Sequence, residues 1–167
     1  GGMEPLEWAK HILRSKMESE YSDAFDIFSD SAAGGNGEAE CNLGLMYVRG
    51  QGVKKDYAEA RRWFELAVEH DDLPAMYYLA KIYAKGYGVA KDPVKAADLY
   101  KQPAECGDPR SQYYLGLAYL DGEGRDRNLS EAAYWFTQAA QQGHTDAQFI
   151  LGQLYKSGAG VQRDIDQ

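Results

Sequence analysis

The segment Ala39-Glu-Cys-Asn-Leu-Gly-Leu-Met-Tyr47 recurs three times, each copy 36 residues after the one before it. The copies start at Ala75, Ser111 and Ala147 and align without a gap. A small residue, a leucine and a tyrosine stand at i, i+4 and i+8 of every copy, which places them on one face of a helix. The chain is therefore predicted to be a helical repeat, and this segment is the first helix of each unit.

Each unit carries a second apolar helical face downstream of the first. Gly44, Gly116 and Gly152 stand beside the core leucine of the first helix, where the absence of a side chain predicts a close approach of the second. Each unit is therefore predicted to be an antiparallel helical hairpin. The matching positions of the second helix are Ala60, Trp63, Phe64 and Ala67, then Ala96, Leu99 and Tyr100, then Ala132, Trp135, Phe136 and Ala139.

Residues typical of helix ends bound the expected helices. A glycine follows each first helix, and a side chain that can accept from exposed N–H groups precedes each second helix. The glycines are Gly50, Gly86, Gly122 and Gly158, and the expected caps of the second helices are Asp56, Asp92, Asn128 and Asp164. Asn36, Asp72 and Asp108 are expected to cap the first helices, and His144 occupies the same place in the last unit.

Weaker helical faces precede the first clear copy, around Trp8 to Ile12 and around Ala24 to Ala32. We therefore expect nine helices in a single domain from residue 3 to 167, with Gly1 and Gly2 as cloning remnants. The first helices should line the concave side of a superhelix. The expected hairpins span residues 3–38, 39–74, 75–110 and 111–146, followed by an unpaired half-repeat at 147–167.

The 36-residue unit resembles the Sel1-like repeat, a relative of the tetratricopeptide repeat, with a full copy at Ala39–Pro74. Its pattern is A-x-x-x-L-G-x-x-Y-x-x-G-x-G-V-x-x-D-x-x-x-A-x-x-W-F-x-x-A-A-x-x-G, from which Arg125, Val68 and Pro103 depart. The resemblance implies an all-α, right-handed superhelical solenoid of antiparallel helix pairs. It also implies an adaptor in bacterial signalling, envelope assembly or host interaction, or in eukaryotic degradation complexes.

Composition argues against several classes of partner. The 167 residues carry a formal charge of −8, which would repel nucleic acid and anionic membrane surfaces. No apolar run is long enough to span a membrane. If Met3 is the natural start, the protein is expected in the cytoplasm, whereas a periplasmic or secreted protein whose signal peptide was removed would have the same sequence.

The sequence predicts neither a cofactor nor a metal site. Cys41 and Cys106 are expected to be free, semi-buried thiols, and the histidines His11, His70 and His144 lie too far apart in the repeat to form a metal-binding face. Serine-nucleophile and dinucleotide motifs are missing. We therefore expect no enzyme. The alternative is an enzyme-type activity on cell-wall or β-lactam-like ligands, which some cysteine-rich members of the resembling family suggest, although their cysteine pairs have no counterpart here.

The expected function is to bind a peptide or protein segment in the concave groove. By analogy with tetratricopeptide hairpins, the groove holds a row of aromatic residues, and its basic residues outnumber its acidic ones. An extended peptide with an acidic residue or a C-terminal carboxylate would suit this surface. The aromatic rings are expected to be partly exposed anchors, and the alternative is that they only pack between neighbouring first helices. The candidate peptide-binding residues are Tyr77, Tyr113, Phe149, Lys81, Lys85, Arg49, Arg110 and Leu117.

Two local expectations concern helix ends. Pro103 falls inside a second helix, so a kink or an early end is expected between Leu99 and Pro103. In the final half-repeat, the helix that starts at Ala147 has no second helix after it to pack against. Leu151, Leu154 and Tyr155 are therefore expected to be partly uncovered. This apolar end, which includes Val161, predicts that the array continues in a longer protein or that the chain associates with itself.

Overall fold

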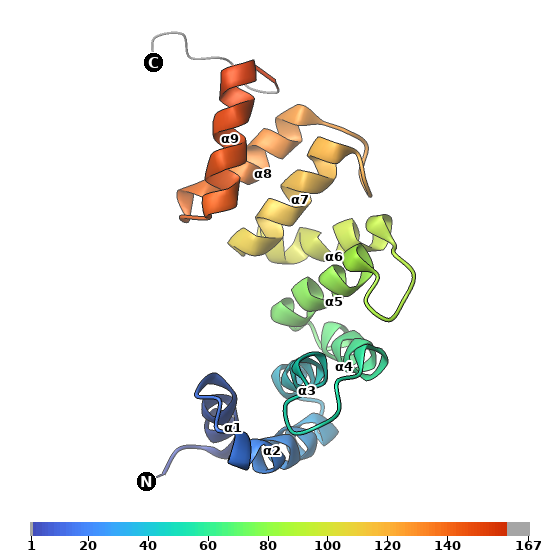
Figure 1. Ribbon diagram of the computed structural model, residues 1–167, viewed down its shortest axis with the longest axis vertical. Helices are drawn as coiled ribbons and strands as arrows, with labels where there is room; N and C mark the ends of the chain where they lie inside the picture. The colour runs from blue at the N-terminus through green and yellow to red at the C-terminus, as the bar shows by residue number, and fades with distance from the viewer. Residues whose placement is uncertain (1, 160–167) are drawn as a thin grey trace. The chain divides into compact units, whose positions relative to one another are not determined.

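The computed structural model describes residues 2–159, and over these residues the chain forms nine α-helices and no strand (Figure 1). The all-α helical repeat predicted from the sequence is confirmed. A short 3₁₀ turn, Glu18–Glu20, precedes the second helix. The helices are α1 Pro5–Arg14, α2 Tyr21–Ala33, α3 Gly37–Arg49, α4 Tyr57–Glu69, α5 Leu73–Lys85, α6 Pro93–Glu105, α7 Pro109–Asp121, α8 Leu129–Gln141 and α9 Thr145–Ser157.

The chain divides into two compact units, and the boundary falls inside α5. The first unit comprises Gly1–Leu79 and Tyr87–Val89. Within it, α1 packs on α2, α2 on α3, and α3 on α4. Ile12, Phe28, Leu43 and Met46 are fully buried in its core, because the apolar faces predicted from the 36-residue period all turn inward.

The second unit comprises Ala80–Gly86 and Ala90–Gln167. Within it, α6 packs on α7, α7 on α8, and α8 on α9. One core cluster joins Phe136 and Ala139 of α8 to Ala147 and Leu154 of α9. Every helix from α2 to α9 has the same length of 13 residues, so the repeat keeps its register along both units.

The caps expected from the sequence are confirmed. Each capping side chain accepts a hydrogen bond from the backbone N–H three residues later, which satisfies one of the exposed donors of the first turn. His144 does the same through Nδ1, 3.2 Å from the N–H nitrogen of Ala147. Gly50, Gly86, Gly122 and Gly158 have φ between 66° and 71°, the left-handed turn expected at the ends of the first helices. The confirmed N-caps are Asn36, Asp56, Asp72, Asp92, Asp108 and Asn128. Asp164 lies outside the described residues.

The expectation that Pro103 ends α6 early is wrong. The helix continues through Pro103 to Glu105, and it ends at the same repeat position as α4 and α8. Pro103 is buried and sits in the last turn, where its own missing N–H removes a single helical bond. Its carbonyl accepts from the N–H of Asp108 at 2.9 Å, so the proline takes part in the turn toward α7.

The uncovered face expected on α9 is found only in part. Tyr155 is exposed and Leu151 is half-buried, as expected. Leu154 is only 6% exposed, because it packs in the cluster of Phe136 and Ala139 on α8. Val161 lies outside the described residues. None of the helices within residues 2–159 combines the length and apolarity that crossing a membrane requires.

Candidate functional site

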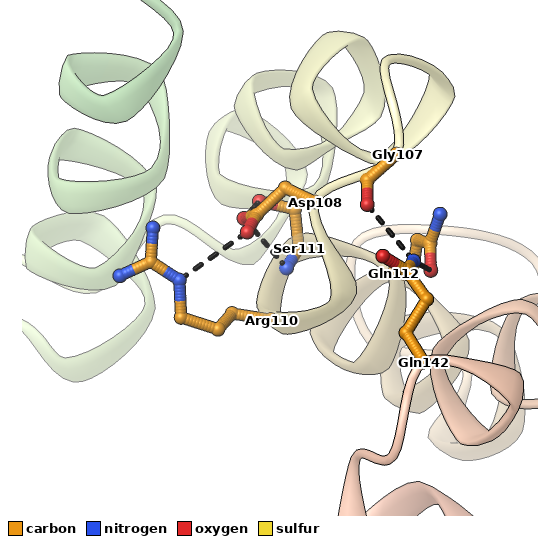
Figure 2. A network of polar contacts seen from close by, with 6 residues as sticks. All are labelled: Gly107, Asp108, Arg110, Ser111, Gln112 and Gln142. Atoms are coloured by element: carbon orange, nitrogen blue, oxygen red, sulfur yellow. Dashed lines mark hydrogen bonds and ion pairs between the residues drawn. The ribbon is translucent and has the colours of Figure 1, made fainter.

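Helix α7 carries the candidate site, and a network of polar contacts fixes its start (Figure 2). Asp108 accepts hydrogen bonds from the backbone N–H of Ser111 at 3.1 Å and from its hydroxyl at 2.6 Å. Arg110, in the first turn, lies with Nε 3.3 Å from the other carboxylate oxygen of Asp108. The capping aspartate therefore also orients the first cation of the site.

A glutamine pair fixes the turn that leads into α7. Gln142, the residue directly after α8, donates from Nε2 to the carbonyl of Gly107 at 2.9 Å and to Oε1 of Gln112 at 3.0 Å (Figure 2). Gln112 is buried and donates its own amide to the carbonyl of Ala104 at 3.1 Å. Buried amides satisfied in this way hold α6, α7 and α8 in one arrangement.

Three of the predicted cations gather in the second unit. Lys81 is half-buried on α5, with Lys85 one turn further along and Arg110 on α7. The pKa of Lys81 is lowered, first because burial penalises its charged form and then because Lys85 and Arg110 are close enough to repel it. These positive charges are thus brought together despite their mutual repulsion, which an approaching carboxylate would relieve.

The apolar part of the site lies on α7 and α9. Tyr113 and Leu117 are half-buried on one face of α7, and the Tyr113 ring stacks on the ring of His144 at a centroid distance of 4.6 Å. Burial raises the pKa of the Tyr113 hydroxyl, and the carboxylate of Asp146 adds to the effect. Phe149 on α9 is 69% exposed. The partial exposure expected of aromatic anchors is found for Tyr113 and Phe149, although Tyr113 also packs within the hairpin.

The expected partial exposure is not found for Tyr77. Its side chain is 6% exposed, and its ring lies edge-on to that of Tyr78 at a centroid distance of 5.2 Å. Sequence alone could not separate Tyr77 from Tyr113, since the two occupy the same repeat position. Arg49 also belongs to the first unit, where it is exposed in the last turn of α3.

The two cysteines are free, as predicted, but neither is semi-buried. Cys41 is buried and Cys106 is exposed. Burial, with Asp72 nearby, raises the pKa of the Cys41 thiol far above its usual range, so the thiol stays protonated and unreactive. Within residues 2–159, no group of three or more potential ligands is placed to hold a metal ion. The enzymatic alternative finds no support in the geometry of Cys41.

The sequence reasoning missed one feature of the second unit. A cavity of about 190 Å³ opens between the end of α5, α6 and α7. The repeat alignment carries a signal for this cavity. Ala84, Pro93 and Ala118 are smaller than the leucines that stand 36 residues later, Leu120, Leu129 and Leu154.

Fold and site together define a helical repeat protein built from hairpins of constant length. The Sel1 repeat model matches residues 37–72, 73–108, 109–144 and 145–167, and the chain belongs to the Sel1 repeat family. These matches start two residues before the hairpins expected from the sequence. No curated protein matches the chain at a significant level.

Solved structures with the same fold include two at higher identity. The chain is 28% identical to a Sel1 repeat protein from Oxalobacter formigenes, with a TM-score of 0.88, covering 98% of this chain and 64% of that one. It is 31% identical to a protective antigen of uropathogenic Escherichia coli with an SLR fold, with a TM-score of 0.83, covering 96% of this chain and 38% of that one. The chain thus spans less than two thirds of either relative. Cysteine rich protein B of Helicobacter pylori, 22% identical over 80% of this chain and 96% of its own with a TM-score of 0.61, shares the fold alone.

Proposed function

We propose that the chain is a protein-interaction scaffold whose second unit binds an extended, acidic segment of a partner protein along the face of α7 that carries Tyr113 and Leu117. Proteins built from Sel1 repeats commonly act as scaffolds of this kind. The observation that carries the finer proposal is the gathering of Lys81, Lys85 and Arg110. Burial first, and then the charges of Lys85 and Arg110, lower the pKa of Lys81.

The chemistry of the segment follows from the two halves of the site. A carboxylate of the segment would meet Lys81 and Arg110 and relieve the repulsion between them. Apolar side chains of the segment would cover Tyr113 and Leu117, which are half-buried, and Phe149, which is exposed. Aromatic residues and arginine are the groups that most often anchor such interfaces. The role proposed for the site is binding, with no step of catalysis.

The experiment starts from a displayed library of random twelve-residue peptides, selected on the wild-type chain and then measured by fluorescence anisotropy. We expect the selected peptides to be rich in Asp or Glu. Lys81→Gln should weaken their binding by about tenfold, the effect of losing one partly desolvated charge-assisted contact. The matched control is Lys101→Gln, which removes the same charge from an exposed side chain of α6. Selected peptides without acidic residues, or equal losses in the two variants, would contradict the proposal.

A further inference from the structure

The cavity in the second unit has small, apolar walls and a charged rim. Its walls include Ala84, Pro93, Ala96 and Ala118, together with the rings of Tyr100 and Tyr114, which stack at a centroid distance of 5.2 Å. Lys85, Asp121 and Glu123 complete the lining. All three of these charged residues are exposed, so they border the opening and the apolar residues form the interior.

The cavity exists because this repeat lacks the side chains that occupy the same place in its neighbours. One repeat further along the chain, Leu120 and Leu154 stand at the positions that Ala84 and Ala118 hold here, and both leucines belong to one packed cluster. Helix α6 starts at Pro93, whereas α4, one repeat earlier, starts at Tyr57. The ring of Tyr57 stacks on that of Tyr87 at 5.0 Å, whereas the corresponding partner of Pro93 is Glu123.

The size of the cavity selects the kind of occupant. Its volume of about 190 Å³ is several times the roughly 30 Å³ that one water molecule takes up in the liquid. It is smaller than the roughly 300–1,000 Å³ of pockets that enclose a whole drug-sized ligand. A single side chain projecting from a bound protein segment suits this volume.

The lining selects the chemistry of that side chain. We propose that the cavity binds the side chain of a lysine or arginine. The alanine and proline walls suit an aliphatic stem, and a positive head group would remain at the rim, as such side chains do at apolar surfaces. The rim carries two carboxylates, Asp121 and Glu123, against the single ammonium of Lys85.

This step alone rests on the proposed function. If the acidic segment binds along α7, the cavity fixes the direction in which the segment runs. Arg110 and Asp121 stand at opposite ends of α7, eleven residues apart, which is about 16 Å along a helix. An extended chain covers that distance in about five residues. The segment would then carry an acidic residue and, about five residues away, a basic one.

The cavity can be tested without any peptide, by NMR of the chain with labelled alanine methyl groups. The probes are n-butylammonium and n-butylguanidinium, with n-butanol as a probe of the same stem and no charge. We expect both cations to shift the methyl signals of Ala84, Ala96 and Ala118 in a saturable way. Ala132 and Ala133, at the places in the fourth hairpin that match Ala96 and Ala97, are the internal control and should not move. Equal binding of n-butanol, or no saturable shift, would overturn the proposal.

Two variants complete the test. Asp121→Asn with Glu123→Gln changes only exposed residues and should weaken binding of the cations about fivefold, the effect of two solvent-screened charges. Ala84→Leu copies Leu120 of the next repeat and should abolish binding by filling the cavity. If that variant fails to fold, Ala118→Leu, which copies Leu154, takes its place. Unchanged binding in the charge variant or in the folded cavity variant would overturn the proposal. None of these results depends on whether the peptides of the proposed function bind.

Discussion

Gly44 lies so close to Phe64 that a methyl group on its Cα would stand 2.5 Å from the Cε1 atom of the ring. The corresponding distance from Gly116 to Phe136 is 2.8 Å. At Gly152, the same place in the last repeat, no described atom lies within 4 Å of such a methyl group. The repeat glycine is therefore a packing residue where the ring of a second helix lies over it.

Alanine substitutions should separate these positions. Gly44→Ala and Gly116→Ala force a methyl group into a buried ring, and we expect each to lower the free energy of unfolding by about 1–3 kcal/mol. Gly152→Ala meets no ring and should raise it by up to about 1 kcal/mol, the usual gain of alanine over glycine in a helix. Urea unfolding measures all three. A loss at Gly152 as large as at Gly44 would contradict this explanation.

A second side-chain pair occupies the same two repeat positions in two hairpins, but with different residues in each. Glu40 is 1% exposed, and one of its carboxylate oxygens lies 2.8 Å from Nδ1 of His70. Gln112 and Gln142 occupy the same two places in the fourth hairpin and are joined by a 3.0 Å hydrogen bond. In both hairpins, the pair fastens the end of the second helix to the first.

Removing one partner should cost more than replacing both. His70→Ala leaves the buried carboxylate of Glu40 without this contact, and we expect a loss of about 1–2 kcal/mol in the free energy of unfolding. Glu40→Gln with His70→Gln copies the pair of the fourth hairpin and should restore most of that stability. Thermal and urea unfolding give both values. A double variant no more stable than His70→Ala would show that the pairs are not equivalent.

Much of the fold could be predicted from the sequence because the repeat signals are local. Capping residues such as Asp56 and the glycine ends such as Gly50 act on the helix that contains them, so they could be placed without three-dimensional information. The burial of individual side chains was harder to predict, because Tyr77 and Tyr113 share a repeat position and differ only in their surroundings. The cavity beside Ala84 needed three small residues from three helices, Pro93 and Ala118 included, and no single helix reveals it.

Asp72 gives a prediction about pH. Burial raises the pKa of its carboxyl group, and Glu38 and Glu40 raise it further, against the hydrogen bond from the backbone N–H of Ala75. The folded state therefore holds this proton more tightly than the unfolded chain, so its contribution lowers stability as pH rises from the ordinary carboxyl range through the raised value. Asp72→Asn removes this loss and can still cap α5, as Asn36 caps α3.

We expect Asp72→Asn to match the wild type in stability near pH 3 and to exceed it at pH 7 by a few tenths to about 1 kcal/mol, since the group is only half-buried. Urea unfolding at a series of pH values measures the difference. Asp72→Ala is the control that loses the cap, and it should be less stable than the asparagine variant at every pH. An advantage of Asp72→Asn that shrinks as pH rises would contradict the assignment.

Phe149 and Leu154 lie on the same helix and should behave in opposite ways. Phe149 is 69% exposed, so Phe149→Ala should change the free energy of unfolding by less than about 0.5 kcal/mol while weakening binding of the selected acidic peptides. Leu154 is 6% exposed, so Leu154→Ala should cost about 2–4 kcal/mol of stability. Calorimetry and anisotropy on the two variants give the four values. A large loss of stability for Phe149→Ala would make it a packing residue.

The central claim is that a partner segment lies on the face of α7 that carries Tyr113 and Leu117. It is tested most directly by the ring signals of isotope-labelled tyrosines during titration with a selected acidic peptide. Tyr113 is half-buried on α7, and Tyr134 on α8 is 53% exposed. The account predicts that the Tyr113 signal shifts and saturates while that of Tyr134 stays in place. A saturating shift at Tyr134 with no change at Tyr113 would contradict it.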